Sequence, residues 1–282
     1  MSRPWLGTLG LAPFGIYVVL FLALPAVLAI WSGLFDKQGA FTLDNVAALA
    51  DPVILRTFWN SIWLSLLTAA IGAVVGALVC YALLGVPATR PARVVVDAAA
   101  GVLAQFGGVM LAFLFIATLG RGSFLTDFLE AAGIDIYAGG MWLYDMPGLV
   151  MPYVYFQVPL MVITFVPALE GLKPQWAEAN LTLGGTRRTF WTRVGLPVLA
   201  PSFLASYLLL FANSFSAYAT AAALASQGSQ IVPLQIRAAL TSETVLGRAN
   251  LAGALAAGMI VVMAAVMAVY SAIQKRAERW RS

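Results

Sequence analysis

Six long apolar stretches decide what this chain can fold into, because each is long enough to cross a membrane. A hydrocarbon core of about 30 Å requires roughly 20 apolar residues in a helix, which satisfies its own backbone hydrogen bonds where water is absent. The stretches lie at residues 11–34, 60–85, 94–119, 148–169, 197–224 and 250–273. Their apolar residues are continuous instead of alternating, which favours helices over strands. The predicted fold is an all-α integral membrane protein with six transmembrane helices.

The composition of the 282-residue chain supports this fold class. Hydrophobic residues make up 61% of the chain and charged residues 10%, and the mean hydropathy is +0.89. Soluble domains have about 45–50% apolar and about 25% charged residues, so a soluble globule is excluded. The first stretch is longer than a signal-peptide core and has no A-x-A site after it, so we interpret it as a retained helix.

Neither an internal repeat nor a low-complexity linker divides the chain, so we expect one membrane domain. Within it, residues 1–59 form an N-terminal helix and outer loop, and residues 60–273 form a core of five helices. Residues 274–282 form a basic tail.

Lysine and arginine are divided unequally between alternate connections, which predicts the orientation in the membrane. One side carries five basic residues: Lys37, Arg56, Arg121, Arg237 and Arg248. The other side carries eleven: Arg3, Arg90, Arg93, Lys173, Arg187, Arg188, Arg193, Lys275, Arg276, Arg279 and Arg281. The positive-inside rule places the side with eleven in the cytoplasm. Both termini belong to that side, so we predict both to be cytoplasmic.

Several function classes are excluded by residues that the sequence lacks. The chain has no histidine and a single cysteine, Cys80, which lies inside an apolar stretch, so we predict no metal site. Its three lysines, Lys37, Lys173 and Lys275, do not occur in a GxxxxGK[ST] phosphate loop, so the chain is not its own P-loop ATPase. No basic run is long enough to follow a nucleic-acid backbone, and we predict no nucleic-acid partner.

The connection at residues 170–197 is the most informative segment. Pro174 is suited to start a helix, and Gly184-Gly185 to end it. Thr186 is suited to cap a second short helix that carries Phe190. We therefore predict two short helices at an angle, which expose apolar and charged side chains together.

The end of this segment is marked by Gly195 and Pro197, which we expect to interrupt the helix before the fifth stretch. Two interpretations remain open on composition alone. The segment is either a knob that docks into a groove on another protein, or a connecting loop that rests on the lipid headgroups.

The same segment resembles a known family. Glu178-Ala179-Asn180, the glycine six residues after the glutamate, and Val194-x-Leu196-Pro197 are similar to the EAA motif of type I ABC importer permeases. These are the inner-membrane permease subunits of binding-protein-dependent importers, and the resemblance extends over about residues 60–272. Asn180 stands where the motif usually has its second alanine, which leaves local helix packing in question.

The resemblance implies that the 170–197 segment is a cytoplasmic coupling-helix loop, which docks into a cleft of an ATPase. Glu178 would orient that contact, and Gly184 would permit the bend between the two helices. The residues assigned to ATPase coupling are Trp176, Glu178, Ala179, Leu183, Gly184, Arg187, Phe190, Leu196 and Pro197.

The resemblance also implies the partners and the cellular location. The chain would form half of a translocation pathway in a prokaryotic cytoplasmic membrane, together with a second, homologous or identical permease subunit. Two cytoplasmic ABC ATPase subunits would bind ATP and Mg, and an extracytoplasmic binding protein would deliver the solute. This chain itself would hold no cofactor and catalyse no reaction.

The solute is predicted only by class. By overall look, the chain is similar to the polyamine and iron branches of the family. The predicted outer side carries eight carboxylates against five basic residues, which mildly favours a cationic ligand or a basic partner surface. We therefore weakly favour a polyamine-like or other cationic or chelated solute.

Five polar residues at membrane depth are candidates for the translocation path: Tyr155, Gln157, Asn213, Ser216 and Tyr218. Polar groups that face lipid would lack hydrogen-bond partners, so they are expected to line a path. Hydrogen bonds between helices explain them equally well. The sequence leaves both explanations open.

Two other classes of function fit the sequence less well. An ion-coupled carrier or channel usually carries carboxylates or broken-helix sites near the membrane midplane. Here Asp97 is the single carboxylate within a predicted span, and near the end of that helix it can pair with Arg90 or Arg93. An intramembrane enzyme would require a cluster of catalytic groups that the predicted spans do not contain.

Three smaller elements are also predicted. Gly72-x-x-x-Gly76 fits a close contact between helices. A short amphipathic helix is expected between Ser123, as N-cap, and Gly133, as C-cap. A second short helix is expected over residues 234–241.

Overall fold

The computed structural model describes residues 4–36, 38–225, 231–241 and 249–279. In these ranges the chain is helical, apart from connections and one bridge between Phe35 and Phe41. Six helical segments are long and apolar enough to cross a membrane: Leu11–Ser32, Pro52–Ala82, Gly108–Ala131, Met146–Glu170, Arg187–Ser216 and Asn250–Ala272. The predicted all-α fold with six candidate spans is confirmed.

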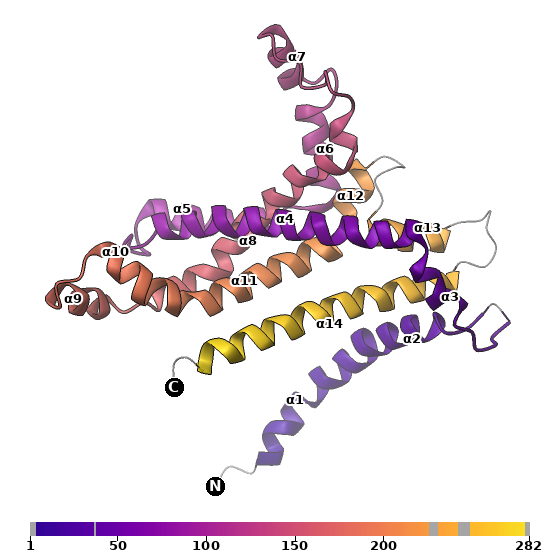
Figure 1. Ribbon diagram of the computed structural model, residues 1–282, viewed down its shortest axis with the longest axis horizontal. Coiled ribbons are helices and arrows are strands. Elements are labelled where there is room, and N and C mark those ends of the chain that lie inside the picture. The colour runs from indigo at the N-terminus through magenta and orange to yellow at the C-terminus, as the bar shows by residue number, and fades with distance from the viewer. Residues whose placement is uncertain (1–3, 37, 226–230, 242–248, 280–282) are drawn as a thin grey trace. The chain divides into compact units, whose positions relative to one another are not determined.

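The chain folds into two compact units (Figure 1). The first combines residues 1–58 with 232–264, and the second combines 59–231 with 265–282. The boundary at 58/59 falls beside the predicted one at 59/60. Residues 232–264, which the sequence placed in the core, group instead with the N-terminal segment. The reason is a shared apolar cluster, in which Ile54 packs with Val232, Leu251 and Leu255.

The first unit contains the following elements: α1 (Pro4–Val18), η1 (Val19–Ala23), α2 (Leu24–Ser32), α3 (Asp44–Ala47), η2 (Ala48–Ala50), the start of α4 (Pro52–Ala82), α13 (Val232–Thr241) and most of α14 (Ala249–Arg279). Glycines let α2 and α14 approach closely. A Cβ added at Gly33 would lie 2.6 Å from the backbone nitrogen of Ala254. Asn250 Nδ2 donates to the carbonyl oxygen of Phe35 at 2.6 Å and fixes the chain after α2.

The second unit contains the rest of α4, the end of α14 and the following elements: α5 (Pro91–Gln105), α6 (Gly108–Leu119), α7 (Phe124–Ala131), η3 (Trp142–Tyr144), α8 (Met146–Glu170), α9 (Pro174–Thr182), α10 (Arg187–Phe190), η4 (Trp191–Gly195), α11 (Leu196–Ser216) and α12 (Ala219–Leu224). Helix α8 packs against α5 and α11, and α6 packs against α12. Figure 1 shows α6 and α7 projecting away from α5, α8 and α11.

Helices α4 and α8 approach each other at the predicted pair of glycines. A Cβ added at Gly72 would lie 2.7 Å from Cβ of Gln157, and one at Gly76 would lie 2.5 Å from Cβ of Met161. Larger residues at these positions would push α8 away. The predicted close contact is confirmed, and α8 remains one helix despite Pro152, Pro159 and Pro167.

The third span differs from the prediction, which took residues 94–119 as one helix. The chain leaves the helical conformation at Phe106 and Gly107, and Gly108 has φ +70°. Glycine adopts positive φ without a steric penalty, so the Gly107-Gly108 pair permits a sharp break. Helix α5 therefore ends at Gln105, and the candidate span of the structure is Gly108–Ala131.

The fifth span is also interrupted, whereas residues 197–224 were expected to form one helix. Helix α11 ends at Ser216, and Ala217 has an extended conformation with ψ 112°. The hydroxyl of Tyr153 donates to the carbonyl oxygen of Ala217 at 2.8 Å. This bond satisfies a backbone group at the break, where water is scarce.

The two short helices between the spans agree with the sequence. Helix α7 ends with Gly133 at φ +82°, and α13 includes the predicted residues 234–241. Ser123 occupies the N-cap position, but its hydroxyl donates to the carbonyl oxygen of Thr118. Residues 226–230 and 242–248 of the predicted outer segment, and 280–282 of the predicted tail, lie outside the described residues.

Candidate functional site

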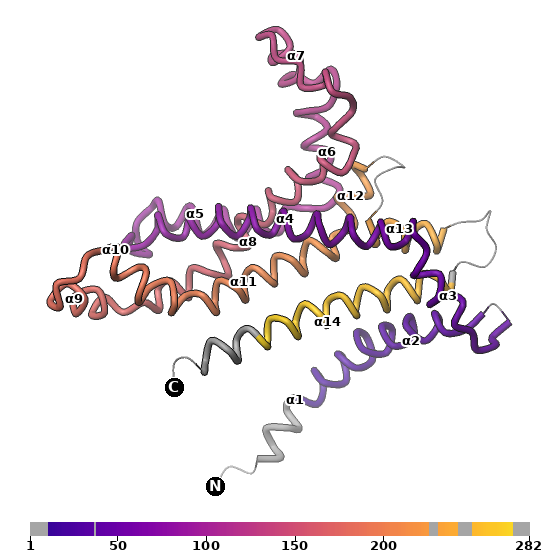
Figure 2. Tube along the Cα trace, viewed as in Figure 1, coloured from indigo at the N-terminus to yellow at the C-terminus, as the bar shows by residue number. Residues whose placement is uncertain are grey.

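The 170–197 segment forms a turn of two short helices between α8 and α11 (Figure 2). Helix α9 begins at Pro174, as predicted, since proline is preorganised for a first helical position. It ends in a Schellman motif: Gly184 N–H donates to the carbonyl of Leu181 at 2.9 Å, and Gly185 N–H to that of Asn180 at 2.8 Å. Gly184 has φ +77°, so this bend requires glycine.

Helix α10 begins directly after the bend. The hydroxyl oxygen of Thr186 accepts from the backbone N–H of Thr189 at 3.2 Å, which confirms the predicted cap. Asn180 Nδ2 donates to the carbonyl oxygen of Thr186 at 3.1 Å and joins the two helices. A Cβ at Gly185 would collide with the same amide, since it would lie 2.7 Å from Cγ of Asn180. The residue that departs from the motif therefore fixes the angle between α9 and α10.

The predicted interruption at Gly195 and Pro197 is wrong, because the helix continues from Arg187 to Ser216. A π-helical turn, η4, occupies Trp191–Gly195 instead. Proline has no N–H for a bond to the residue four before it, and its ring crowds that carbonyl. The wider turn accommodates Pro197 without a break. Similarly, η1 precedes Pro25 in the first unit.

Three residues assigned to coupling share one face of α9. Trp176, Ala179 and Leu183 are three and four positions apart, which places them on the same side of a helix. With Arg193, Val194 and Val198 they line a mostly apolar groove of about 470 Å³. Leu183 is 87% exposed. Glu178 is exposed, and among the described residues it has no hydrogen-bond or ion-pair partner.

Three other assigned residues face elsewhere. Arg187 Nη2 donates to the hydroxyl oxygen of Tyr81, at the end of α4, at 2.6 Å. Phe190 is buried, at 9% exposure, and lines a cavity inside the unit. Leu196 is exposed and lies on a different apolar groove beside Trp191. The structure thus groups Trp176, Ala179 and Leu183 on one surface and Arg187 with α4.

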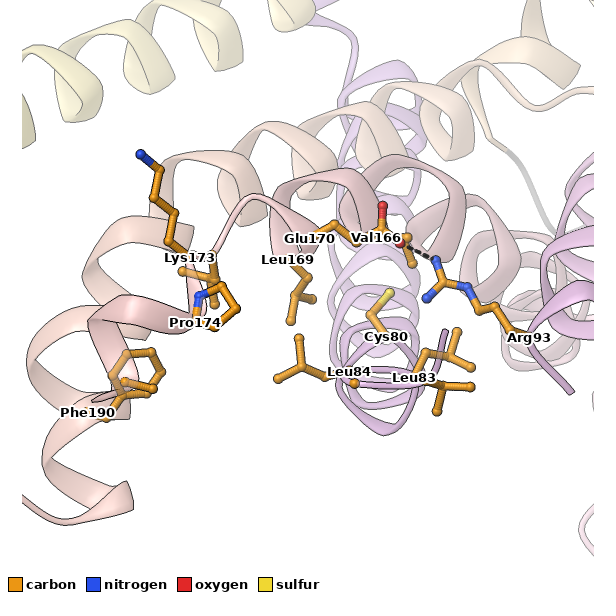
Figure 3. A pocket seen from close by; sticks show the side chains of 14 residues that line it. Cys80, Leu83, Leu84, Arg93, Val166, Leu169, Glu170, Lys173, Pro174 and Phe190 are labelled. Carbon is orange, nitrogen blue, oxygen red and sulfur yellow. Dashed lines mark hydrogen bonds and ion pairs between the residues drawn. The ribbon is translucent and has the colours of Figure 1, made fainter. Parts of the chain in front are cut away.

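The inner cavity lies where this segment begins (Figure 3). It has a volume of about 350 Å³ and is lined by Cys80, Leu83, Leu169, Phe190 and other residues. Arg93 lies at its edge and pairs with Asp97 at 2.8 Å and with Glu170 at 2.7 Å. The hydrogen bond to Asp97 raises the pKa of Arg93 above its ordinary value. The expected structural ion pair of Asp97 is confirmed.

The candidate path residues on α8 point in different directions. Gln157 is fully buried, and its Nε2 donates to the hydroxyl oxygen of Thr68 on α4 at 2.7 Å. The hydroxyl groups of Thr68 and Ser214 lie 3.1 Å apart, so the three residues join α4, α8 and α11. Gln157 Oε1 has no partner among the described residues. In this conformation Gln157 is part of an interhelical network.

The other path candidates lie near the two helix breaks. The ring of Tyr155 lies 6.4 Å from the rings of both Phe106 and Phe115, on either side of the first break. Asn213 and Ser216 are exposed on one face of α11, just before the second break, and Tyr218 follows it. The Ser216 hydroxyl donates to the carbonyl oxygen of Ala212 at 2.9 Å. These groups are polar, uncharged and close to interrupted backbone.

Sequence reasoning missed Tyr81, Thr68 and Glu170, and it identified Arg93 only as a possible partner of Asp97. Tyr81 holds Arg187, Thr68 joins three helices, and Arg93 with Glu170 ties α5 to the end of α8. The two residues of each pair are more than 70 positions apart in the sequence, so no local pattern predicts the contact. The one available signal was the position of Arg93 four residues before Asp97 at the predicted membrane boundary.

Residues 133–282 match the family model described as "Binding-protein-dependent transport system inner membrane component". The sulfate transport system permease protein CysT of Synechocystis sp. is 28% identical over 80% of this chain and 73% of its own length. CysT of Salmonella typhimurium is 34% identical, over 39% of this chain. The alignment spans only 36% of that relative's length. The putative ferric permease FbpB 1 of Haemophilus influenzae is 25% identical over 71% of this chain and 31% of its own length.

Solved structures share the fold. A chain of a bacterial ABC transporter involved in the import of the polysaccharide alginate superposes with a TM-score of 0.78. That match covers 98% of this chain and 96% of the other, at 18% identity. A chain of the MetNI methionine ABC transporter gives a TM-score of 0.61 at 14% identity, over 81% of this chain and 99% of the other.

Proposed function

This chain belongs to the family of binding-protein-dependent transport system inner membrane components, and from that premise we propose that it is the transmembrane permease subunit of an ATP-driven ABC importer. It would form half of the translocation pathway, beside a second permease subunit. ATP would be hydrolysed by two partner subunits, and a binding protein would deliver the solute. The ion-coupled carrier, the alternative class, is not favoured by the family.

The observation that carries this proposal is the surface of α9. An apolar groove of about 470 Å³ opens beside Trp176 and Leu183. The same short helix carries Glu178, which is exposed and has no partner among the described residues. Exposed apolar area next to a charge without a partner is typical of a protein interface. The Schellman bend at Gly184 and the Asn180 bond to Thr186 hold this surface in one shape.

The mechanism follows from how this segment is attached. Closure of the partner ATPases would displace α9, and the continuous helix from Arg187 to Ser216 would carry the displacement into the membrane. The Arg187–Tyr81 hydrogen bond would carry it to α4. The two helix breaks are the positions where the spans can change direction. We propose that this motion alternates access to the path.

The orientation is part of the proposal. The excess of basic residues predicts that the 170–197 segment and both termini are cytoplasmic. Helix α7 would then lie on the opposite side of the inner membrane. For the path we propose Tyr155, Asn213, Ser216 and Tyr218. Gln157 would join it in another conformation, since its Oε1 lacks a partner in the described part of the chain.

We further propose that the solute is a small inorganic oxyanion. Relatives named as sulfate and molybdenum permeases support this class, and the candidate path residues are neutral side chains able to donate hydrogen bonds to oxygen. A ferric complex is the second candidate, because a ferric transport permease aligns over 71% of this chain. None of these relatives points specifically to a polyamine, which the sequence had weakly favoured.

The test is reconstitution with the ABC ATPase and the binding protein of the proposed complex. We expect the three components to copurify and to import radiolabelled sulfate or molybdate with ATP. Ferric citrate and spermidine serve as the other arms, and uptake of either would replace the proposed solute class. Absence of any ATPase association, with the chain correctly inserted, would contradict the importer assignment.

A further inference from the structure

Arg93 is the charged side chain that the described part of the protein buries, with 5% of its surface exposed. Its carboxylate partners are far more open: 45% of the Asp97 side chain and 57% of the Glu170 side chain are exposed. A buried guanidinium is expensive unless its hydrogen bonds are satisfied. Three described hydrogen bonds meet that requirement here: two go to Asp97 and one goes to Glu170.

Asp97 lies one turn further along α5 and holds the guanidinium in place. Arg93 Nε donates to both carboxylate oxygens of Asp97, at 3.0 and 2.8 Å. The planar group is thereby oriented so that Nη2 donates to Oε1 of Glu170 at 2.7 Å (Figure 3). The ion pair within α5 therefore aims Arg93 at α8.

Glu170 is the residue from which the 170–197 segment departs. It is the last residue of α8, and α9 begins at Pro174. The cavity of about 350 Å³ borders this point, with Leu169 and Phe190 in its wall. A tightly packed interior would resist displacement, whereas this cavity leaves room for the end of α8 to move.

The other end of α5 leads to the first helix break. The 15 residues of α5 form a rod of about 22 Å. Directly after it, the ring of Phe106 contacts that of Tyr155, a candidate path residue. Helix α6 then packs against α12, which follows the second break. One rod thus connects the start of the 170–197 segment to both interruptions.

We propose that Arg93 is a positioning residue for coupling: its ion pair with Glu170 transfers displacement of the 170–197 segment through α5 to the helix breaks. This role rests on the proposed function. It adds a third connection, through α5, to those through α10 and α11 and through the Arg187–Tyr81 hydrogen bond to α4. Arg93 touches neither solute nor nucleotide and acts through Glu170 alone.

The experiment compares Glu170→Gln, Arg93→Gln and the double variant in proteoliposomes that contain both partner proteins. The readout is the number of solute molecules imported per ATP hydrolysed, for whichever of sulfate, molybdate, ferric citrate or spermidine the wild-type complex imports. Arg90→Gln is the matched control, because Arg90 is exposed and three positions before Arg93. Thermal unfolding in detergent reports on the fold of each variant.

We expect each single change to lower the import-to-hydrolysis ratio about tenfold, and the double change to lower it no further, since each single change already removes the Arg93–Glu170 ion pair. Glu170→Asp, which keeps the charge, should restore most of the ratio, and Arg90→Gln should leave it unchanged. Glu170→Gln removes no buried charge and should remain folded even if Arg93→Gln does not.

A wild-type ratio in Glu170→Gln would overturn the proposal, as would a double variant whose loss is the product of the two single losses. A lower melting temperature with an unchanged ratio would show a structural role only. Failure of the proposed function looks different: the wild-type complex itself would then import none of the four solutes.

Discussion

The α9–α10 turn is held by hydrogen bonds between residues close together in the sequence, whereas the helix break at Ala217–Tyr218 is held by the hydroxyl of Tyr153 on another helix. The other helix break lies at Phe106–Gly108. In the turn, the start, the bend and the cap were all predicted, at Pro174, Gly184 and Thr186. At the breaks, continuous spans were expected, and the structure interrupts both. The turn is fixed by residues within 15 positions of each other, whereas the break after Ser216 is stabilised by a group far away in the chain.

This difference explains which functional residues could be found. Helix caps and Schellman turns depend on local backbone geometry, so single residues in the sequence predict them. The break after Ser216 depends on the Tyr153 hydroxyl, which is 64 positions from Ala217. Residues with local roles are therefore recognisable, and those with roles between helices are not.

The largest effect should come from Glu178→Ala in the turn. Loss of a charge-assisted contact at a buried interface costs roughly 2–5 kcal/mol, so association with the ATPase should fall at least thirtyfold. Copurification and binding measurements in detergent would show this. Gln175→Ala, on the same helix but outside the motif, is the control and should change binding little. Equal binding by both variants would remove Glu178 from the interface.

Two matched substitutions, Gly184→Val and Gly133→Val, compare the α9–α10 turn with the end of α7. Gly184 (φ +77°) and Gly133 (φ +82°) end helices in the same Schellman geometry, and no atom of the described residues lies within 4 Å of a Cβ added at either. Valine at either should strain the backbone by about 1–2 kcal/mol. We expect only Gly184→Val to abolish binding-protein-stimulated ATP hydrolysis. If Gly133→Val does the same, the effect is general destabilisation.

Two substitutions, Thr68→Val and Asn213→Leu, distinguish residues that line the translocation path from residues that hydrogen-bond between helices. Thr68→Val keeps the side-chain shape but removes the hydroxyl that joins Gln157 to Ser214, at a cost of about 1 kcal/mol. We expect it to lower the melting temperature and leave uptake per folded complex nearly intact. Asn213→Leu should lower uptake per folded complex and leave the melting temperature nearly unchanged, because Asn213 is exposed on α11.

The contrary result would be informative as well. If Thr68→Val impairs uptake without changing stability, the buried network is part of the path in the working cycle. If Asn213→Leu leaves uptake unchanged while assembly stays normal, the polar face of α11 has a packing role instead.

The smallest effect is expected from Asn180→Ala, which restores the residue that the EAA motif usually has. It removes the bond from Asn180 Nδ2 to the Thr186 carbonyl, worth about 0.5–1.5 kcal/mol. Both groups are exposed to water, so the loss should fall at the low end. Coupling should stay within about twofold of the wild type, measured as stimulated ATP hydrolysis. A complete loss would show that the angle between α9 and α10 is critical.

Most of the fold was predictable from hydropathy, since six spans and the all-α class follow from the length of the apolar runs. The Gly107-Gly108 break was visible in principle, because adjacent glycines inside a span permit positive φ. The grouping of residues 232–264 with the N-terminal segment was not predictable from the sequence, since it depends on which apolar helix faces pack together. Hydrophobic runs identify spans but not their neighbours.

The candidate site was predictable only where its residues are close in sequence. Trp176, Ala179 and Leu183 recur at helical spacing, and the structure places them on one groove. Arg187 belonged to the same predicted set, but its partner is Tyr81, 106 positions earlier. Which side of a helix becomes buried is decided by packing against distant segments, and the sequence pattern of one helix does not contain that information.

Site-specific photo-cross-linking tests the central claim, that the 170–197 segment docks onto the ATPase, most directly. Leu183 on this segment and Phe124 on α7 are both 87% exposed, which makes them matched positions for a photoreactive phenylalanine analogue. In cells that express the whole complex, we predict a cross-link from position 183 to the ATPase subunit and none from position 124. A cross-link to the ATPase from position 124 would contradict the account. The absence of a cross-link from both positions in an assembled complex would contradict it as well.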